Sequence, residues 1–423
     1  MAYFQSEEIT KSPERSSEAY LDKSSSELVN HLQTEIAKTP GHNIGDFFTK
    51  SLWSWLSHYI KSRFGRKFPY PSYPLPETGI YELATDKVTK LAVTSDWATD
   101  PPESFDIALE IKKQEPDYTV HVGDTYFVGA PSEINSNFVE QGSPWVRGTT
   151  GSFAVLGNHE MYARGDAFFE RLLPTLGLRN ESGAYTGQKA GYFCLQNDHW
   201  RILGLDTGYH STGRPIIEFL PGFSPDCHFD DEQMEWLEKT VKLGDKSDKR
   251  GLLIFSHHQF ISAFCKESEY PKPAQQLASL LGPDRTILWL WGHEHKLAIY
   301  GKIQEKSGLS VYGRCIGHGG TPVEVQSKNF ELCTKQNGYE ALVGFYKRKQ
   351  KTVNKTDLGY NGYVICHIDN EVITLDYVDN MGPLLSEKWV ADLKSGTIQG
   401  KIEVLSDKKL TLAPGKSWDN AVQ

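Results

Sequence analysis

From about residue 86 onward, short apolar runs alternate with stretches of helical periodicity. Six of these runs end in polar residues, and they lie within residues 89–96, 117–124, 152–159, 200–207, 251–258 and 285–295. Their short length and their β-branched and aromatic content favour buried strands over helices. Between the runs, residues 101–114, 166–177 and 230–244 are predicted to be helical, the last with Asp230 as N-cap and Gly244 as stop. The alternation predicts an α/β fold.

The two ends of the chain follow other patterns. Leu28, Leu32 and Ile36 recur at helical spacing near the N-terminus, and residues 69–76 are rich in proline, which marks a linker. Near the C-terminus, residues 361–379 are predicted to form two strands joined by a turn at Asp369 and Asn370. Residues 401–413 are predicted to form another hairpin.

Composition excludes several classes of protein. The chain has 423 residues and a net charge of −9, which argues against nucleic-acid binding because that binding depends on basic surface. No apolar run is long enough to span a membrane, and the first residues carry no secretory signal pattern. The six cysteines are widely spaced with no C-x-x-C pair. We therefore expect mostly reduced thiols and a cytoplasmic protein.

Polar side chains gather where five of the predicted strands end. In an α/β sheet the loops that follow the strands line one edge, so residues far apart in sequence converge there. Asp, Asn and His ligands suit cations such as Mn, Fe or Zn, and too many are present for one tetrahedral ion. A two-metal site bridged by one carboxylate is the natural interpretation. The candidate residues are Asp96, Asp124, Asn158, His159, Glu160, His257, His258, His293, Glu294 and His295.

These residues stand in five blocks whose order resembles that of a known superfamily. The blocks read TSDWA, GDTYF, LGNHE, FSHHQ and WGHEH along the chain. Together they resemble the metallophosphoesterase (calcineurin-like phosphoesterase) superfamily. The resemblance implies a four-layer α/β/β/α sandwich. It also suggests an N-terminal helical extension and linker at 1–85, a catalytic domain at 86–380 and a C-terminal strand extension at 381–423.

The resemblance also implies roles for individual residues. Asp124 is expected to bridge two ions, with Asp96 and His295 on the first ion. Asn158, His257 and His293 are expected to hold the second ion. His159 is expected to donate to a phosphoryl oxygen or to protonate the leaving group, with Glu160 orienting it.

The first block departs from the common form of the superfamily. Most members have Asp-x-His there, whereas Ala98 stands at the histidine position in this chain. This departure suggests the purple acid phosphatase-like branch, which uses a tyrosine in GDxxY. Here Phe127 occupies that position and Tyr126 comes one residue earlier. Either Tyr126 coordinates the first ion, which would make Fe(III) plausible, or a water replaces a protein ligand.

Further residues have two interpretations each. His258 either contacts phosphate or faces a polar pocket, and His210 either reaches substrate or has a structural role. Residues 52–67 combine aromatic and aliphatic positions with Lys and Arg. An amphipathic basic helix of this kind is able to make weak contact with an anionic membrane surface, although packing on the catalytic domain is favoured.

The resulting functional prediction is a metal-dependent phosphoesterase. It would hydrolyse a phosphomonoester or a small phosphodiester by attack of a metal-bridging hydroxide, with two ions of Fe, Mn or Zn. Its expected partner is a small phosphorylated substrate. The alternative is a catalytically weak or inactive binding or scaffold protein that keeps this fold.

Overall fold

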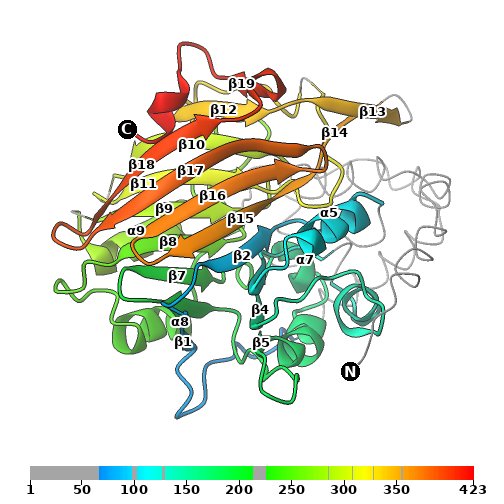
Figure 1. Cartoon of the computed structure of the whole chain (residues 1–423), viewed down its shortest axis with the longest axis vertical. Coiled ribbons are helices and arrows are strands. Elements are labelled where there is room, and N and C mark those ends of the chain that lie inside the picture. Colours follow the sequence, from blue (N-terminus) through cyan, green and yellow to red (C-terminus); the bar gives the residue numbers. More distant parts are fainter. Residues whose placement is uncertain are drawn as a thin grey trace.

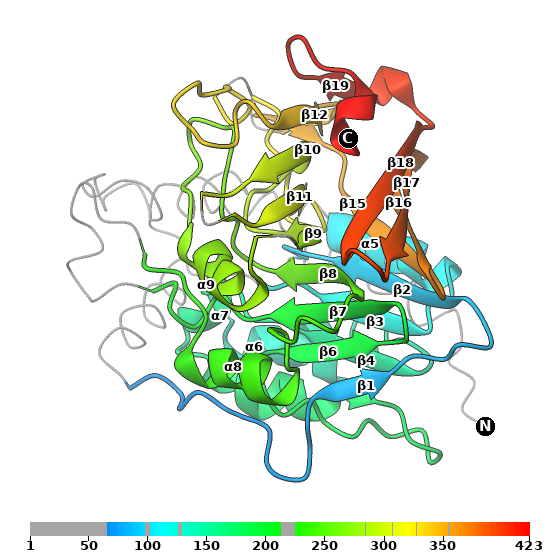
Figure 2. The ribbon, with the colours of Figure 1, turned by 90° about the vertical axis from the view of Figure 1, so that its left-hand side faces the viewer.

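The computed structural model of the chain describes residues 66–97, 102–125, 129–212, 225–283, 285–306, 308–326, 328–353 and 356–423. Within them, two large β-sheets pack face to face, and helices and turns lie on their outer sides (Figure 1, Figure 2). The predicted N-terminal helix, and almost all of the basic segment 52–67, lie outside the described residues.

The first sheet has nine strands, and its central part is parallel. Strands β7, β8, β9 and β11 run parallel to one another, as expected for α/β connections. In spatial order the strands are β1 (Ile80–Glu82), β6 (Phe193–Gln196), β7 (Trp200–Leu205), β8 (Gly251–Ser256), β9 (Thr286–Trp291), β11 (Ser310–Ile316), β10 (Leu297–Gln304), β12 (Leu342–Tyr346) and β19 (Leu410–Leu412).

The second sheet has eight strands and joins a parallel part to an antiparallel meander. Strands β2, β3 and β4 are parallel, and β15 to β18 follow each other antiparallel. In spatial order the strands are β18 (Thr397–Val404), β17 (Gly382–Asp392), β16 (Val372–Asp379), β15 (Gly362–Asp369), β2 (Thr89–Thr94), β3 (Tyr118–His121), β4 (Gly151–Ala154) and β5 (Gly177–Leu178). A separate hairpin consists of β13 (Lys349–Val353) and β14 (Thr356–Gly359).

The described helices are few and mostly short. The α-helices are α5 (Pro102–Lys113), α6 (Pro131–Ile134), α7 (Asn158–Met161), α8 (Asp231–Glu235) and α9 (Lys272–Leu281). Single turns of π- or 3₁₀-helix are η3 (Asn135–Val139), η4 (Phe168–Leu172), η5 (Leu173–Thr175), η7 (Trp236–Thr240), η8 (Asp407–Lys409) and η9 (Trp418–Ala421).

Two of the three predicted helices are present. The helix predicted at 101–114 is confirmed as α5. The prediction at 230–244 is confirmed as α8 and η7, and the Asp230 side chain accepts a hydrogen bond from the Glu232 backbone, as an N-cap does. That helix ends at Thr240, before Gly244. Residues 166–177 form only the turns η4 and η5, so the prediction of a regular helix there is wrong.

Three layers of buried apolar side chains hold the sandwich together. Leu253 of β8 and Val93 of β2 belong to the layer between the two sheets. On the opposite face of β8, Ile254 packs with Leu277 of α9, whereas Ile107 of α5 packs on the outer side of the second sheet. Because both faces of the central strands are covered, their sequences are continuous apolar runs rather than alternating ones. The predicted four-layer α/β/β/α fold is confirmed.

One ion pair lies inside the layer between the sheets. Arg314 of β11 donates from Nε to both carboxylate oxygens of Glu387 of β17, at 2.9 and 3.0 Å. Both side chains are fully buried. Trp389 Nε1 and Tyr377 OH also donate to Glu387, which satisfies the carboxylate and ties the two sheets together.

The C-terminal predictions have mixed outcomes. The two strands predicted at 361–379 are confirmed as β15 and β16, with Asn370 in the left-handed region at φ 50°. The hairpin predicted at 401–413 is wrong, because β18 pairs with β17 in one sheet and β19 with β12 in the other. The domain boundaries stay a prediction. None of the described helices is long and apolar enough to cross a membrane.

Candidate metal centre

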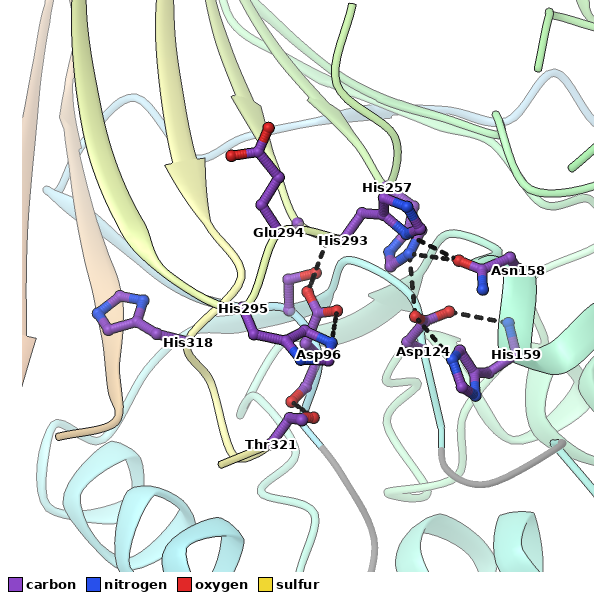
Figure 3. Close-up of polar contacts among 12 residues, drawn as sticks. Asp96, Asp124, Asn158, His159, His257, His293, Glu294, His295, His318 and Thr321 are labelled. Carbon is purple, nitrogen blue, oxygen red and sulfur yellow. Dashed lines mark hydrogen bonds and ion pairs between the residues drawn. The ribbon is translucent and has the colours of Figure 1, made fainter. Parts of the chain in front are cut away.

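The polar residues of the five blocks come together at one edge of the two sheets (Figure 3). Asp96, Asp124 and Asn158 follow β2, β3 and β4 of the second sheet, and His257 and His293 follow β8 and β9 of the first. Because β2, β3 and β4 are parallel to one another, as are β8 and β9, the carboxyl ends of each set lie together at one edge of its sheet.

The backbone is strained where these side chains converge. Asp96, Asp124 and His293 have positive φ angles of 53°, 68° and 63°, a region that L-residues rarely adopt. The glycine of the GNH block permits the close approach, since a Cβ on Gly157 would lie 2.1 Å from Asp124 Oδ1. The glycine of this block is therefore required for steric reasons, because a side chain at this position would collide with Asp124.

Asp96 is completely buried and only partly hydrogen-bonded. Its Oδ2 accepts from Ser95 Oγ at 2.8 Å and from the His293 backbone at 2.9 Å. Its Oδ1 has no hydrogen bond and lies 3.5 Å from His295 Nε2. Burial, together with the nearby Asp124 carboxylate, raises the pKa of Asp96 to about 8. A buried carboxylate of this kind suits a cation, which would favour its charged form.

Asp124 lies in the middle of the cluster. Its Oδ1 accepts from the His159 backbone at 2.9 Å. Its Oδ2 lies 3.1 Å from His257 Nε2 and 3.7 Å from His159 Nε2. Burial opposes the charged form, but the neighbouring His257 and His159 outweigh it and hold the pKa of Asp124 well below its usual range. Asp124 therefore lies close to both His257 and His159.

The orientation of His257 is set by a hydrogen bond on the far side of its ring. Its Nδ1 donates to the Val122 carbonyl at 2.9 Å, which directs Nε2 into the cluster. Burial lowers the basicity of the ring, yet the Asp124 carboxylate raises the pKa of His257 to about 9. In the folded protein the ring thus binds a proton where a cation would otherwise bind.

Asn158 is oriented in a similar way. Its Nδ2 donates to Tyr162 OH at 3.1 Å, so its Oδ1 faces His257 Nε2 at 3.1 Å and His293 Nδ1 at 2.9 Å. Burial lowers the pKa of His293 to about 3, followed in size by the effect of His257. Burial also lowers the pKa of His295 to about 4. Neutral imidazoles are the form in which histidine binds metals.

Two groups of potential ligand atoms lie close enough together to hold a metal ion. The atoms of Asp96, Asp124 and His257 lie within 4.8 Å of one another, as do those of His257, His258 and His293. Among the described residues these are the groups of three or more such side chains. The donors are oxygen and imidazole nitrogen, and the residues therefore fit cations such as Mn, Fe or Zn.

Glu160 acts on the backbone rather than on the His159 ring. Its carboxylate accepts from the backbone of Gly157 at 2.9 Å and of Asp124 at 3.2 Å, and also from Thr125. Burial raises the pKa of Glu160 to about 7, and Asp124 adds to this effect. Glu160 therefore joins the loops after β3 and β4.

The remaining predicted residues are placed differently. His258 is buried beside the cluster, with Nδ1 3.1 Å from Thr207 Oγ1 and its ring 4.7 Å from that of His293. His210 lies apart from the blocks and contacts Asp230 at 2.9 Å and the ring of His228. Tyr126 and Ala98 lie outside the described residues, so the predicted coordination of the first ion by Tyr126 stays a prediction.

Some residues at the centre were not predicted. The backbone and hydroxyl of Thr321 each donate to the Asp96 carbonyl at 2.8 Å. Lys296, which follows His295, forms a buried ion pair with Glu267 at 2.7 Å. The glycines around Thr321 were a signal of a tight loop, but Glu267 had no sequence signal because its pairing depends on the tertiary fold.

An α/β/β/α sandwich with a buried Asp, Asn and His cluster at its strand ends defines the class of metallophosphoesterase-type folds. Residues 89–297 match the family model of the calcineurin-like phosphoesterases. Residues 89–297 thus form a calcineurin-like phosphoesterase domain, and the resemblance drawn from the motifs is confirmed. The purple acid phosphatase-like branch stays a prediction.

Several solved structures are similar to the chain at low identity. One is titled GAP50, the anchor in the inner membrane complex of Plasmodium, with 15% identity, 79% of this chain and 92% of that chain covered, and a TM-score of 0.40. A predicted phosphoesterase from Streptococcus pneumoniae TIGR4 has 11% identity, 75% and 99% coverage, and a TM-score of 0.26. Chaetomium thermophilum Vps29 has 10% identity, 77% and 98% coverage, and a TM-score of 0.25. No curated protein matches the chain.

Proposed function

We propose that the chain hydrolyses a phosphomonoester or a small phosphodiester at a two-metal centre. The observation that carries the proposal is the position of Asp124. Its carboxylate lies within 3.1 Å of His257 Nε2, belongs to the same group of ligand atoms as Asp96, and is 3.7 Å from His159 Nε2.

The donors divide into two sets around that carboxylate. Asp96 and His295 would hold the first ion with Asp124, because His295 Nε2 faces Asp96 Oδ1 at 3.5 Å. Asn158, His257 and His293 would hold the second ion with Asp124, since the Asn158 oxygen contacts both rings. Two bound cations supply Lewis acidity and lower the pKa of water, so that hydroxide is available near neutral pH.

His159 is the candidate general acid. Its backbone donates to Asp124 Oδ1 at 2.9 Å, and its ring packs against Tyr162 with the centroids 4.9 Å apart. These two contacts hold Nε2 close to the shared carboxylate. From there, Nε2 would hold a proton and pass it to the leaving-group oxygen of the ester.

His258 is a candidate contact for a phosphoryl oxygen. Its Nδ1 is engaged by Thr207 at 3.1 Å, and Thr207 also accepts from the His258 backbone at 2.9 Å. This pairing leaves Nε2 for a ligand. His210 contacts Asp230 and His228. It would therefore contact a substrate only at a point away from these blocks.

The test is a metal-by-substrate screen of the purified chain. Protein prepared without chelator and loaded with Mn, Fe or Zn is expected to hydrolyse p-nitrophenyl phosphate or its bis ester. Activity should disappear with a chelator and return with the metal, and metal analysis should give close to two ions per chain. A chain that binds two ions but hydrolyses none of a panel of monoesters, diesters and nucleotides would contradict the proposal and support a binding protein instead.

A further inference from the structure

Two cysteines lie next to each other on loops outside the blocks of the metal centre. Cys265 is in the segment between β8 and α9, and Cys333 is in the segment between β11 and β12. Phe264 and Leu332 form a short antiparallel bridge between these segments. The Cys265 backbone donates to Glu331, and the Cys333 backbone donates to Ala263, each at 2.9 Å.

This bridge brings the two cysteines next to each other. Residues 265 and 333 each come one position after the bridge pair, and Cys265 lies in a turn in which the Glu267 backbone donates to the Phe264 carbonyl at 3.1 Å. Cys265 Sγ lies 3.5 Å from the carbonyl oxygen of Leu332, the residue that precedes Cys333. Each thiol also shifts the pKa of the other, as expected for neighbouring sulfurs. A disulfide between diagonal neighbours of this kind requires the two loop segments to move toward each other.

Cys265 and Cys333 are also the two cysteines that solvent reaches. Cys265 is exposed and Cys333 is partly exposed, whereas the other four cysteines are buried. For example, burial raises the pKa of Cys194 to about 12, which disfavours its reactive thiolate. An oxidant in solution would therefore meet Cys265 and Cys333 first.

The two thiols are not equivalent. Hydrogen bonds from the Cys265 thiol, and then from the backbone of Lys335, lower the pKa of Cys333. The same contact with Cys333 raises the pKa of Cys265 to about 11. Cys333 is thus the more acidic thiol of the pair, and Cys265 is its less acidic neighbour.

A metal site is not the better interpretation of this pair. In the described part of the chain, the groups of three or more potential ligand side chains all lie at the metal centre. Two thiols alone do not complete a tetrahedral site. Oxidation, by contrast, requires only two neighbouring sulfurs and an accessible oxidant.

We propose that Cys333 and Cys265 form a reversible redox site in which a hydroperoxide converts the two thiols into an intramolecular disulfide. The Cys333 thiolate attacks the terminal oxygen of hydrogen peroxide, which forms sulfenic acid and releases hydroxide. The Cys265 sulfur then attacks the Cys333 sulfur, and the hydroxyl group leaves as water with the Cys265 proton. The protein loses two electrons and peroxide is reduced to water.

The disulfide would join two segments that contact the wall of the metal centre. Phe264 and Phe330 both lie against the Lys296 ammonium, at 4.5 and 5.7 Å from the ring centroids. Gln336 Nε2 also donates to the Glu267 carbonyl at 2.6 Å. The segments are thus already in register, and a cross-link that closes a long loop there would raise Tm by about 5 °C.

The test follows the thiols of the full chain during treatment with hydrogen peroxide. The wild type is expected to lose two of its six thiols and to give a Cys265–Cys333 cross-linked peptide in mass spectrometry. Dithiothreitol should restore both thiols. The cross-link should form with or without added Mn or Zn. The outcome of this experiment therefore does not depend on whether the protein hydrolyses phosphoesters.

Two variants test the order of the steps. Cys265→Ser leaves Cys333 without a resolving thiol, so dimedone should label Cys333 as a stable sulfenic acid. Cys333→Ser removes the thiolate, so Cys265 should react at least tenfold more slowly at the same peroxide dose. The proposal is overturned if the wild type keeps all six thiols, if the cross-link joins two chains or a different pair, or if both variants react at the same rate.

Discussion

The two ends of the same parallel strands carry very different clusters of charge. At the carboxyl ends of β8 and β9, His257 and His293 face the acidic residues of the metal centre. At the amino ends of β7, β8 and β9 stand Arg201, Arg250 and Arg285. Each cluster is largely buried, and each brings together residues that are distant in sequence.

The amino-end cluster is organised around the carboxylate of Asp248, and both of its oxygens accept hydrogen bonds. Asp248 accepts from Arg250 Nε at 3.0 Å and Nη2 at 2.8 Å, and lies 2.7 Å from Arg201 Nη2. Arg285 donates to the Asp248 carbonyl at 2.6 Å. None of these four residues has a positive φ angle. A hollow of about 290 Å³ opens beside them, with two acidic and two basic side chains in its wall.

The two clusters differ in backbone strain and in the kind of atom that is left without a hydrogen bond. At the metal centre, three residues have strained backbones and the Asp96 Oδ1 atom has no hydrogen bond. At the amino end, three guanidinium groups surround one carboxylate, and the buried Nε atoms of Arg201 and Arg285 have no hydrogen bond, but the backbone of these residues is not strained. Strain and an unsatisfied ligand atom are tolerated where a bound cation would offset them.

The comparison is tested most strongly by matched Asp→Asn substitutions at the two ends. Asp124→Asn removes the shared charge and is expected to lower hydrolysis by about 10³-fold, equal to about 4 kcal/mol of transition-state stabilisation. Asp248→Asn is expected to leave the hydrolysis rate within about twofold while it lowers stability by about 1–2 kcal/mol. Steady-state kinetics and thermal unfolding of both variants measure this. A comparable loss of activity in both variants would contradict the distinction.

The next largest effect separates proton transfer from metal binding. His159→Ala is expected to lower kcat by about 10²-fold because the leaving group loses its proton donor. The metal content should stay at the wild-type level, since the His159 ring contacts Asp124 only at 3.7 Å. Kinetics together with metal analysis test this. If the variant loses its ions, His159 holds metal rather than a proton.

A smaller effect is expected for the residue that joins two of the loops. In Glu160→Gln, the amide group of the new side chain would face backbone N–H donors now bound by the carboxylate. We expect activity to fall about tenfold through displacement of Asp124 and His159. Activity that is unchanged, with unchanged metal content, would show that the carboxylate does not hold the loops in place.

The smallest effect is a pH dependence of stability that differs between the two ends. In metal-free protein, the pKa of Asp96 is raised to about 8 and that of His257 to about 9, so the folded state binds these protons more tightly than the unfolded state. The contribution of Asp96 is lost from about pH 4 to 8 and that of His257 from about pH 6.5 to 9, so Tm should fall by several degrees between pH 5 and 9. Saturating metal should remove this decline.

The amino-end cluster should respond in the opposite direction. Asp248 has its pKa lowered to about 2, because its hydrogen bonds and ion pairs with Arg250 and Arg201 outweigh the effect of burial. Its contribution is complete above pH 4 and is lost as pH falls toward 2. The Tm difference between wild type and Asp248→Asn should therefore be constant from pH 5 to 9. A difference that shrinks at alkaline pH would contradict this assignment.

The strands and the strand-end residues could be predicted because both depend on local pattern. A run such as 251–258 is apolar on both faces, which predicts a covered strand, and the polar residues that follow must lie at its end. The motif order also predicted that Asp96 and His295, far apart in sequence, would face each other, and their side chains lie 3.5 Å apart.

The predictions were wrong where the local sequence pattern does not determine which elements pack or pair with one another. Residues 401–413 contain two strands with the spacing of a hairpin, but β18 and β19 join different sheets. The helical periodicity at 166–177 ends as single turns, because apolar spacing records which side chains are buried and not how many turns form.

The sequence by itself determined the α/β class, the superfamily and the set of polar residues that meet at one edge. Only the tertiary structure decided that Glu160 holds backbone amides, that Thr321 and Lys296 support the centre, and that Cys265 and Cys333 are neighbours. Motifs record the residue types that chemistry needs along the chain. Contacts between loops depend on how two sheets pack, and no local pattern encodes that packing.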